Sequence, residues 1–168
     1  MKRREVKDCH EESVLSSFKE HLRSQGKILT IMERPDPPDA IVKIDHNITW
    51  IEITDAFLNG NHARSLTSYA ADDTEHVPSE ETFIFEPDQV FLGEVVNVIN
   101  KKYEKATITD AYKTHGSGIL LVGLYSPFVD RGEIVDIIAE VLKMKRNKDS
   151  RFKRIYFYDQ AHRFYPVE

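Results

Sequence analysis

The chain has 168 residues, of which 40% are hydrophobic and 30% are charged, and its formal net charge is −5. This length predicts a single domain over residues 1–168, with enough apolar side chains to build a core. The acidic balance excludes a cationic field over the whole surface, so any contact with nucleic acid would depend on a local basic patch. The lone cysteine, Cys9, excludes an internal disulfide and a cysteine zinc site.

The sequence also indicates a compartment. The basic residues at positions 2–4 are not followed by an apolar segment, so no signal peptide is expected. No apolar run approaches the roughly 20 residues that a membrane span needs. A reducing compartment is the simplest for a chain with one cysteine, and we predict a cytoplasmic protein without membrane contact.

The first predicted element is a helix over residues 11–25, which Gly26 ends. One face of this helix has a stripe at helical spacing, made of Glu11, Val14, Leu15, Phe18 and Leu22. The apolar members are candidate core residues. Glu11 has two interpretations, because an acid at the start of a helix also interacts favourably with the helix dipole.

Three strands are predicted next, over residues 27–32, 40–44 and 48–54. Prolines at 35, 37 and 38 exclude helix and favour an extended approach to the second strand. The short polar residues at 45–47 are typical of a tight turn. The second and third strands should therefore form a hairpin, with the third near the centre of the sheet.

This hairpin brings two carboxylates together. Asp39 opens the second strand, and Glu52 lies between Ile51 and Ile53 on the third, so both acids should reach the same end of the hairpin. Carboxylates at such a distance repel each other, and a divalent cation relieves the repulsion. A carboxylate within so apolar a strand also requires a partner.

Residues 33–57 resemble the PD-(D/E)XK phosphodiesterase superfamily, which includes restriction endonucleases and Holliday-junction resolvases. The family motif is Pro-Asp, a strand-length gap, and then Asp or Glu, any residue, and Lys. Asp39 follows two prolines and matches the first acid, with Asp36 after Pro35 as the alternative, and Glu52 matches the second acid. Thr54 stands where the family has its lysine.

The resemblance implies a nuclease that uses Mg²⁺ (or Mn²⁺) to hydrolyse nucleic-acid phosphodiesters. It implies that Asp39, Glu52 and the backbone carbonyl of Ile53 hold the metal, and that Glu11 is a further acid from the first helix. The motif lysine helps to position and polarise the attacking water, and in some members it comes from another position. The candidates for that replacement are Lys43, which shares a strand face with Asp39, and Lys101, Lys102 and Lys105.

Two other hypotheses remain open. In the first, Thr54 and the acidic charge indicate a catalytically inactive protein of the same fold that binds nucleic acid or a protein partner. In the second, the carboxylates are structural, which pairing of Glu52 with a buried Lys or Arg would support.

The second half of the chain alternates helices and strands. Helices are predicted over 63–71, 89–105 and 131–144, and strands over 116–125, 154–158 and 164–167, with a short edge strand over 82–85. The run at 119–124 is apolar throughout, which is typical of a buried central strand. The pattern predicts an α/β protein with a three-layer α/β/α sandwich and a mixed central sheet, and it fits the restriction-endonuclease-like core.

A basic cluster lies between the last helix and the last long strand. Its candidate nucleic-acid-binding residues are Lys145, Arg146, Lys148 and Arg151. Phosphate binding and a solvated helix end explain this cluster equally well. The aromatic residues at 156–158 and 164–165 suit base stacking, a core strand or a homodimer face. Of the histidines, His10 is expected to be solvated. His62 follows the strand that carries Glu52 and is expected on a surface loop, with a role as a proton shuttle as the alternative.

Overall fold

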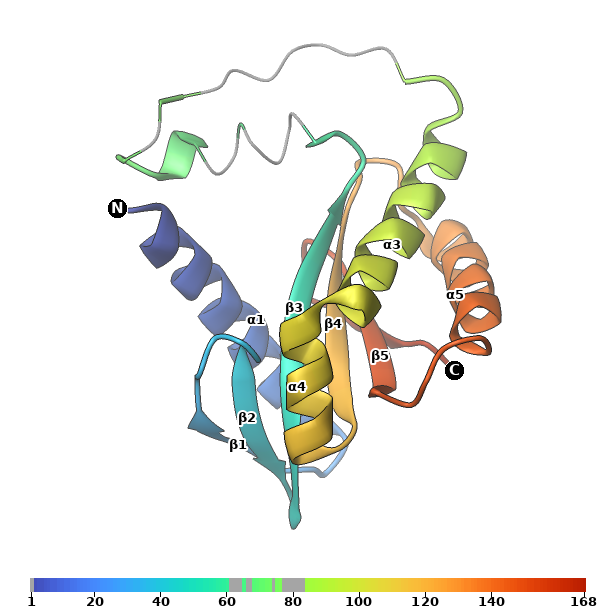
Figure 1. The fold of residues 1–168 in the computed structure, drawn as a ribbon. Helices are drawn as coiled ribbons and strands as arrows, with labels where there is room; N and C mark the ends of the chain where they lie inside the picture. Colours follow the sequence, from blue (N-terminus) through green and yellow to red (C-terminus); the bar gives the residue numbers. More distant parts are fainter. Residues whose placement is uncertain (1, 61–64, 66–67, 74, 77–83) are drawn as a thin grey trace.

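A computed structural model describes residues 2–60, 65, 68–73, 75–76 and 84–168, and a six-stranded mixed sheet lies at its centre (Figure 1). The strands follow one another across the sheet in chain order. Strands β1 to β3 are antiparallel, β3 to β5 are parallel, and β6 is antiparallel to β5. Their bounds are β1 (Leu29–Glu33), β2 (Ala40–Ile44), β3 (Asn47–Phe57), β4 (Gly118–Tyr125), β5 (Phe152–Tyr158) and β6 (Phe164–Pro166).

Helices cover both faces of this sheet (Figure 1). Helix α1 (Arg3–Ser24) packs on one face, where Leu15 and Phe18 join the core that contains Ile51 and Ile53. On the other face lie α3 (Pro87–Glu104), α4 (Ala106–His115) and α5 (Arg131–Lys145), whose apolar residues surround Trp50. Side chains alternate between faces along a strand, so Trp50 and Ile51 belong to different cores.

The predicted α/β class with a mixed central sheet is confirmed. The hairpin of β2 and β3 is present, and the central position of β3 and the burial of β4 are also as predicted. Helix α1 begins at Arg3, eight residues before the predicted start at residue 11. That extra length is polar, and the apolar stripe used for the prediction begins only at Glu11 and Val14.

Helix α4 is an element that the sequence did not predict. Only Ile108 and Ala111 are buried along it, and three of its ten residues are threonines, which are weak helix formers. Too few apolar residues recur to mark a helical face, so tertiary packing must hold this segment in place.

Some predictions fall on residues that the structure does not describe. They concern His62, residues 63–64 and 66–67 of the helix predicted at 63–71, and residues 82–83 of the strand predicted at 82–85. Across the ranges that are described, no helix combines the length and the apolar character that crossing a membrane requires.

A step in the sheet positions the polar residues. Strand β2 begins at Ala40, which pairs with Ile51, while β3 continues as far as Phe57 beside β4. Beyond Ile51, no strand among the described residues pairs with the edge of β3 that faces β2. The end of β3 and the loop that leads into β2 meet at this step.

Candidate functional site

Two acidic residues meet where β2 begins. Because Ala40 pairs with Ile51, Asp39 and Glu52 are the next residues in register on the two strands. Their exposed fractions are only 4% and 1%. Oδ2 of Asp39 accepts a hydrogen bond at 2.7 Å from the backbone N–H of Ile53, a group that no longer has a partner in β2. The convergence expected from the hairpin is therefore present.

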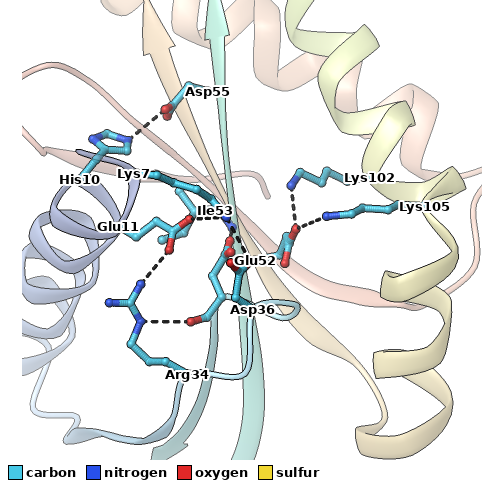
Figure 2. Close-up of polar contacts among 11 residues, drawn as sticks. Lys7, His10, Glu11, Arg34, Asp36, Glu52, Ile53, Asp55, Lys102 and Lys105 are labelled. Carbon is cyan, nitrogen blue, oxygen red and sulfur yellow. Dashed lines mark hydrogen bonds and ion pairs between the residues drawn. The ribbon is translucent and has the colours of Figure 1, made fainter. Parts of the chain in front are cut away.

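Helix α1 brings a third acid, Glu11, to the same edge (Figure 2). Arg34 donates to Oε2 of Glu11 at 2.7 Å and to the backbone carbonyl of Asp39 at 3.3 Å. Lys7, one turn earlier on α1, lies 3.2 Å from Oε1 of Glu11. Arg34 thus fastens the helix to the loop before β2, and Glu11 is buried with two cationic partners.

The three acids act on one another electrostatically. Burial, followed by the negative charges of Glu52 and Glu11, raises the pKa of Asp39 to about 7, against the opposing effects of the Ile53 N–H and of Lys102. The protonated form of Asp39 is therefore favoured to a much higher pH than that of an exposed aspartate. Such a shift is typical of carboxylates that a fold holds together against their repulsion, and shifts of this kind are concentrated at functional sites.

Glu52 points to the other face of the sheet and meets the end of α3 (Figure 2). Lys102 donates to its Oε1 at 2.6 Å, and Nζ of Lys105 lies 3.5 Å from the same oxygen. The side chain of Lys102 is 18% exposed, so this is a largely buried ion pair. Within the part of the chain that the structure describes, the buried Oε2 of Glu52 has no hydrogen-bond partner.

The candidate lysines separate clearly. Lys102 and Lys105 contact Glu52, whereas Lys101 and Lys43 are exposed. Lys43 shares a face with Asp39 but lies four residues further along β2, about 13 Å away at the usual rise of a strand. Thr54, two residues after Glu52, is half-buried on β3 and brings no charge.

Asp36, the alternative first acid, is engaged by Lys7 at the surface. Its carboxylate is exposed and accepts a hydrogen bond from Lys7 at 3.0 Å, which holds the pKa of Asp36 below its usual range. Asp39 is therefore the acid that the fold places beside Glu52.

The donor atoms suit a hard cation. Within the described residues, no group of three His, Cys, Asp or Glu side chains is already arranged around a common metal position. Mg²⁺ needs fewer protein ligands than that, because it keeps several water molecules and takes one or two carboxylates. Asp39 and the unpartnered Oε2 of Glu52 fit this requirement, and a cation there would relieve the repulsion that raises the pKa of Asp39.

The basic cluster is mostly engaged in internal contacts. Arg151 is 12% exposed and bonds to Asp149, to the backbone carbonyl of Tyr103 and to Thr109. Lys145 donates to the backbone carbonyl of Lys153, and the ammonium of Lys148 lies 5.6 Å from the centre of the Tyr103 ring. Arg146 is exposed. Arg151 therefore joins the turn before β5 to the junction of α3 and α4.

The sequence did not indicate one further polar cluster. His10 is not fully solvated: its side chain is 34% exposed, and Nε2 lies 2.9 Å from Oδ2 of Asp55. The hydroxyl of the buried Tyr158 donates to the other oxygen of Asp55. The hydrogen bond to Asp55 raises the pKa of His10 although burial opposes it. These residues are distant in sequence, and only the spacing of Asp55 from Ile53, on the face that packs on α1, was available as a signal.

Comparisons with known proteins do not assign this chain to a family. Neither models of protein families, nor curated proteins, nor solved structures gave a match. The functional interpretation therefore depends on the geometry of the site.

Proposed function

We propose that this protein is a nuclease that uses Mg²⁺ (or Mn²⁺) to hydrolyse nucleic-acid phosphodiesters at Asp39 and Glu52. One observation carries the proposal: buried carboxylates from α1, the start of β2 and β3 lie close enough to act on one another, and burial, followed by the charges of Glu52 and Glu11, raises the pKa of Asp39 to about 7. A fold gains no stability from holding like charges together in its interior. A divalent cation turns the same arrangement into a binding site.

In this proposal, Asp39 and Glu52 hold the ion together with the backbone carbonyl of Ile53. When bound, the ion supplies an acidified water and stabilises the charge that develops at phosphorus. The N–H of Ile53 fixes the orientation of Asp39. Arg34 and Lys7 hold Glu11 in place near Asp39.

In this proposal, Lys102 replaces the motif lysine, because Thr54 cannot supply a positive charge. Its ammonium is already directed at Glu52 from α3, on the face to which Glu52 points. Lys105 is more exposed and lies beside it, where a positive charge can attract a phosphate. The order of a helix, an antiparallel meander and then parallel strands supports a restriction-endonuclease-like fold for this site.

The pairing of Glu52 with Lys102 also supports a second candidate function. The same contact is expected when the carboxylates are structural and the protein is catalytically inactive. An inactive protein of this fold that binds nucleic acid or a protein partner is a separate alternative, which Thr54 and the acidic net charge favour. The two candidates differ in what happens to the free oxygen of Glu52. In the active protein it binds a cation, and in the inactive protein it does not.

Calorimetric titration of Mg²⁺ and Mn²⁺ into the wild type, Glu52→Gln and Glu12→Gln tests the proposal. Glu12 is the matched control, because it is an exposed glutamate beside Glu11. We expect the wild type and Glu12→Gln to bind the ion and Glu52→Gln to lose binding. If the wild type binds neither ion and cleaves neither DNA nor RNA in their presence, the inactive candidate replaces the proposal.

A second variant separates binding from chemistry. Lys102→Met should keep metal binding, because Oε2 of Glu52 has no partner to lose and Oε1 loses the nearer of its two lysines, and should lose metal-dependent cleavage. Lys101→Met, the exposed neighbour, should keep both. Cleavage that survives in Lys102→Met would assign the replacement of the motif lysine to another residue.

A further inference from the structure

A cavity of about 850 Å³ lies beside the acidic site, and its size is within the usual range for a small-molecule pocket. It opens between the first turns of α1 and the carboxyl ends of β3 and β4. In open α/β sheets, that edge is where ligands bind. The lining used below consists of Arg3, Arg4, Lys7, His10, Phe57 and Tyr125.

One wall of the cavity is aromatic. The rings of Phe57 and Tyr125 stack with their centroids 4.8 Å apart and an angle of 17° between their planes. Both side chains are half-buried, so part of this flat surface remains accessible. A planar ring stacks well on such a surface, and the gain is similar for every nucleobase.

The rim of the cavity carries both cations and acids: Arg3, Arg4 and Lys7 line it together with Asp36, Asp55 and Asp73, and Asp73 accepts a hydrogen bond from the backbone N–H of Arg3 at 2.7 Å. Arg3 and Arg4 are exposed, and neither guanidinium forms a hydrogen bond or ion pair within the described residues. Lys7 differs, because Glu11 and Asp36 already engage it. A guanidinium matches the geometry of a phosphate with two parallel hydrogen bonds, so the arginines form an accessible anion-binding edge.

Between the wall and the rim lies a fixed polar group, His10. Asp55 orients its ring, and Tyr158 in turn fixes Asp55, so the imidazole does not need to be ordered when a ligand binds. The ring of His10 also lies near Tyr125, with the centroids 6.4 Å apart. A ligand on the aromatic wall would therefore have a hydrogen-bonding group at its edge.

We infer that this cavity binds a nucleotide unit, with its base on Phe57 and Tyr125 and its phosphate at Arg3 and Arg4. A planar ring joined to an anion is the chemistry that this wall and this rim share. Lys7 lines the cavity and also contacts Glu11, so the bound unit lies next to the acidic site. The inference rests on the proposed function in one respect: if the acidic site cleaves a phosphodiester, the bound nucleotide is a neighbour of the bond that is cleaved.

The test measures binding without metal, so that it is independent of Asp39 and Glu52. AMP and a short single-stranded oligodeoxyadenylate are titrated calorimetrically, in EDTA, into the wild type, Arg4→Gln, Phe57→Leu and Arg23→Gln. Arg23 is the matched control, because it is an exposed arginine at the other end of the same helix. The exposed position of Arg4 keeps the test valid even if Phe57→Leu folds poorly.

We expect at least one probe to bind, with affinity about tenfold weaker in Arg4→Gln and in Phe57→Leu and unchanged in Arg23→Gln. Binding of AMP identifies a free nucleotide as sufficient, and binding of the oligomer alone identifies a unit within a strand. Absence of saturable binding at millimolar concentration, or equal binding by Arg4→Gln and the wild type, overturns the inference. If the nucleotide probes bind as expected but the wild type binds neither Mg²⁺ nor Mn²⁺, the nuclease proposal is overturned and the nucleotide site stands.

Discussion

The molecule contains two networks of charged residues that differ in how completely their charges are matched. Around Arg151, the guanidinium meets a carboxylate, a backbone carbonyl and a hydroxyl, and the hydrogen bond from Arg151 lowers the pKa of Asp149. Around Asp39, burial and neighbouring acids raise the pKa of the carboxyl to about 7. The first network stabilises the charge of Asp149, whereas the second opposes the charge of Asp39, although Glu11 and Glu52 each have cationic partners.

This difference separates a structural network from a candidate active site. A matched network needs no further partner, and the contacts of Arg151 join the turn before β5 to the junction of α3 and α4. The acidic network has an unpartnered oxygen on Glu52 and a protonated fraction on Asp39. An incoming cation can satisfy both.

The largest expected effect is on the pH dependence of stability. The pKa of Asp39 is above its unfolded value of 3.8, so its stabilising contribution is complete below about pH 4 and is lost as the pH rises to about 7. Asp39→Asn should remove this pH-dependent loss of stability. At about 1.4 kcal/mol for each pKa unit, the loss amounts to about 4 kcal/mol in the free energy of unfolding. Urea denaturation at pH 2, 4, 6 and 8 measures the free energy of unfolding over this range.

Asp149→Asn is the matched control for that experiment. The pKa of Asp149 is lowered, so its contribution is present above the unfolded pKa and is lost as the pH falls. The two variants should therefore change the pH profile in opposite directions. Parallel changes would contradict the contrast between the networks.

The next effect concerns the ion pair of Glu52. Lys102→Met leaves a buried carboxylate with only the more distant Lys105, and we expect a loss of about 3 kcal/mol in the free energy of unfolding. Mg²⁺ should restore part of this loss by taking the place of the ammonium. Lys101→Met, the control, should have almost the same free energy of unfolding as the wild type. If Mg²⁺ stabilises Lys102→Met no more than it stabilises Lys101→Met, the pair of Glu52 and Lys102 is purely structural.

A smaller effect is expected at the matched network. Arg151→Met removes the hydrogen bonds to the Tyr103 carbonyl and to Asp149, at a cost of about 2 kcal/mol in stability. It should leave Mg²⁺ affinity unchanged, because it is not part of the acidic network. The exposed Arg146→Met is its control for stability. Loss of metal binding in Arg151→Met would show that the two networks are coupled and would contradict this prediction.

The smallest effect is at His10, which is partly exposed. The hydrogen bond to Asp55 raises the pKa of His10, so the stabilisation is complete below its ordinary value of 6.5 and is lost as the pH rises through the raised value. Because solvent screens this pair, we expect under about 1 kcal/mol in stability. An NMR titration of the imidazole should show a lower pKa in Asp55→Asn, and an unchanged pKa would contradict the contact.

Local pattern was enough to predict the hairpin and with it the acidic pair. β-branched residues on both sides of a polar turn define β2 and β3, and a hairpin of that length leaves Asp39 and Glu52 at one end. Glu11 could be proposed because it continues the apolar stripe of α1. Nothing local identifies Lys102 among the lysines near the end of α3, because that choice depends on how the helix crosses the sheet.

Long-range contacts account for what the sequence did not predict. His10, Asp55 and Tyr158 come from three elements, and only the packing of α1 on β3 and β5 brings them together. Arg151 was placed in a basic cluster by its neighbours in the chain, whereas its partners include residues more than 40 positions away. Helix α4 has too few buried side chains to produce a periodic signal.

The pairing of Ala40 with Ile51 has one more consequence. If the two strands paired one residue out of step, the side chains of β3 would change faces relative to β2, and Glu52 would turn toward the apolar core under α1 while Trp50 left its own core. A misaligned hairpin would thus bury a charge away from both lysines. The buried charge and the lost packing both disfavour the shifted register. The residues that build the site therefore also help to select the correct pairing of the strands that carry them.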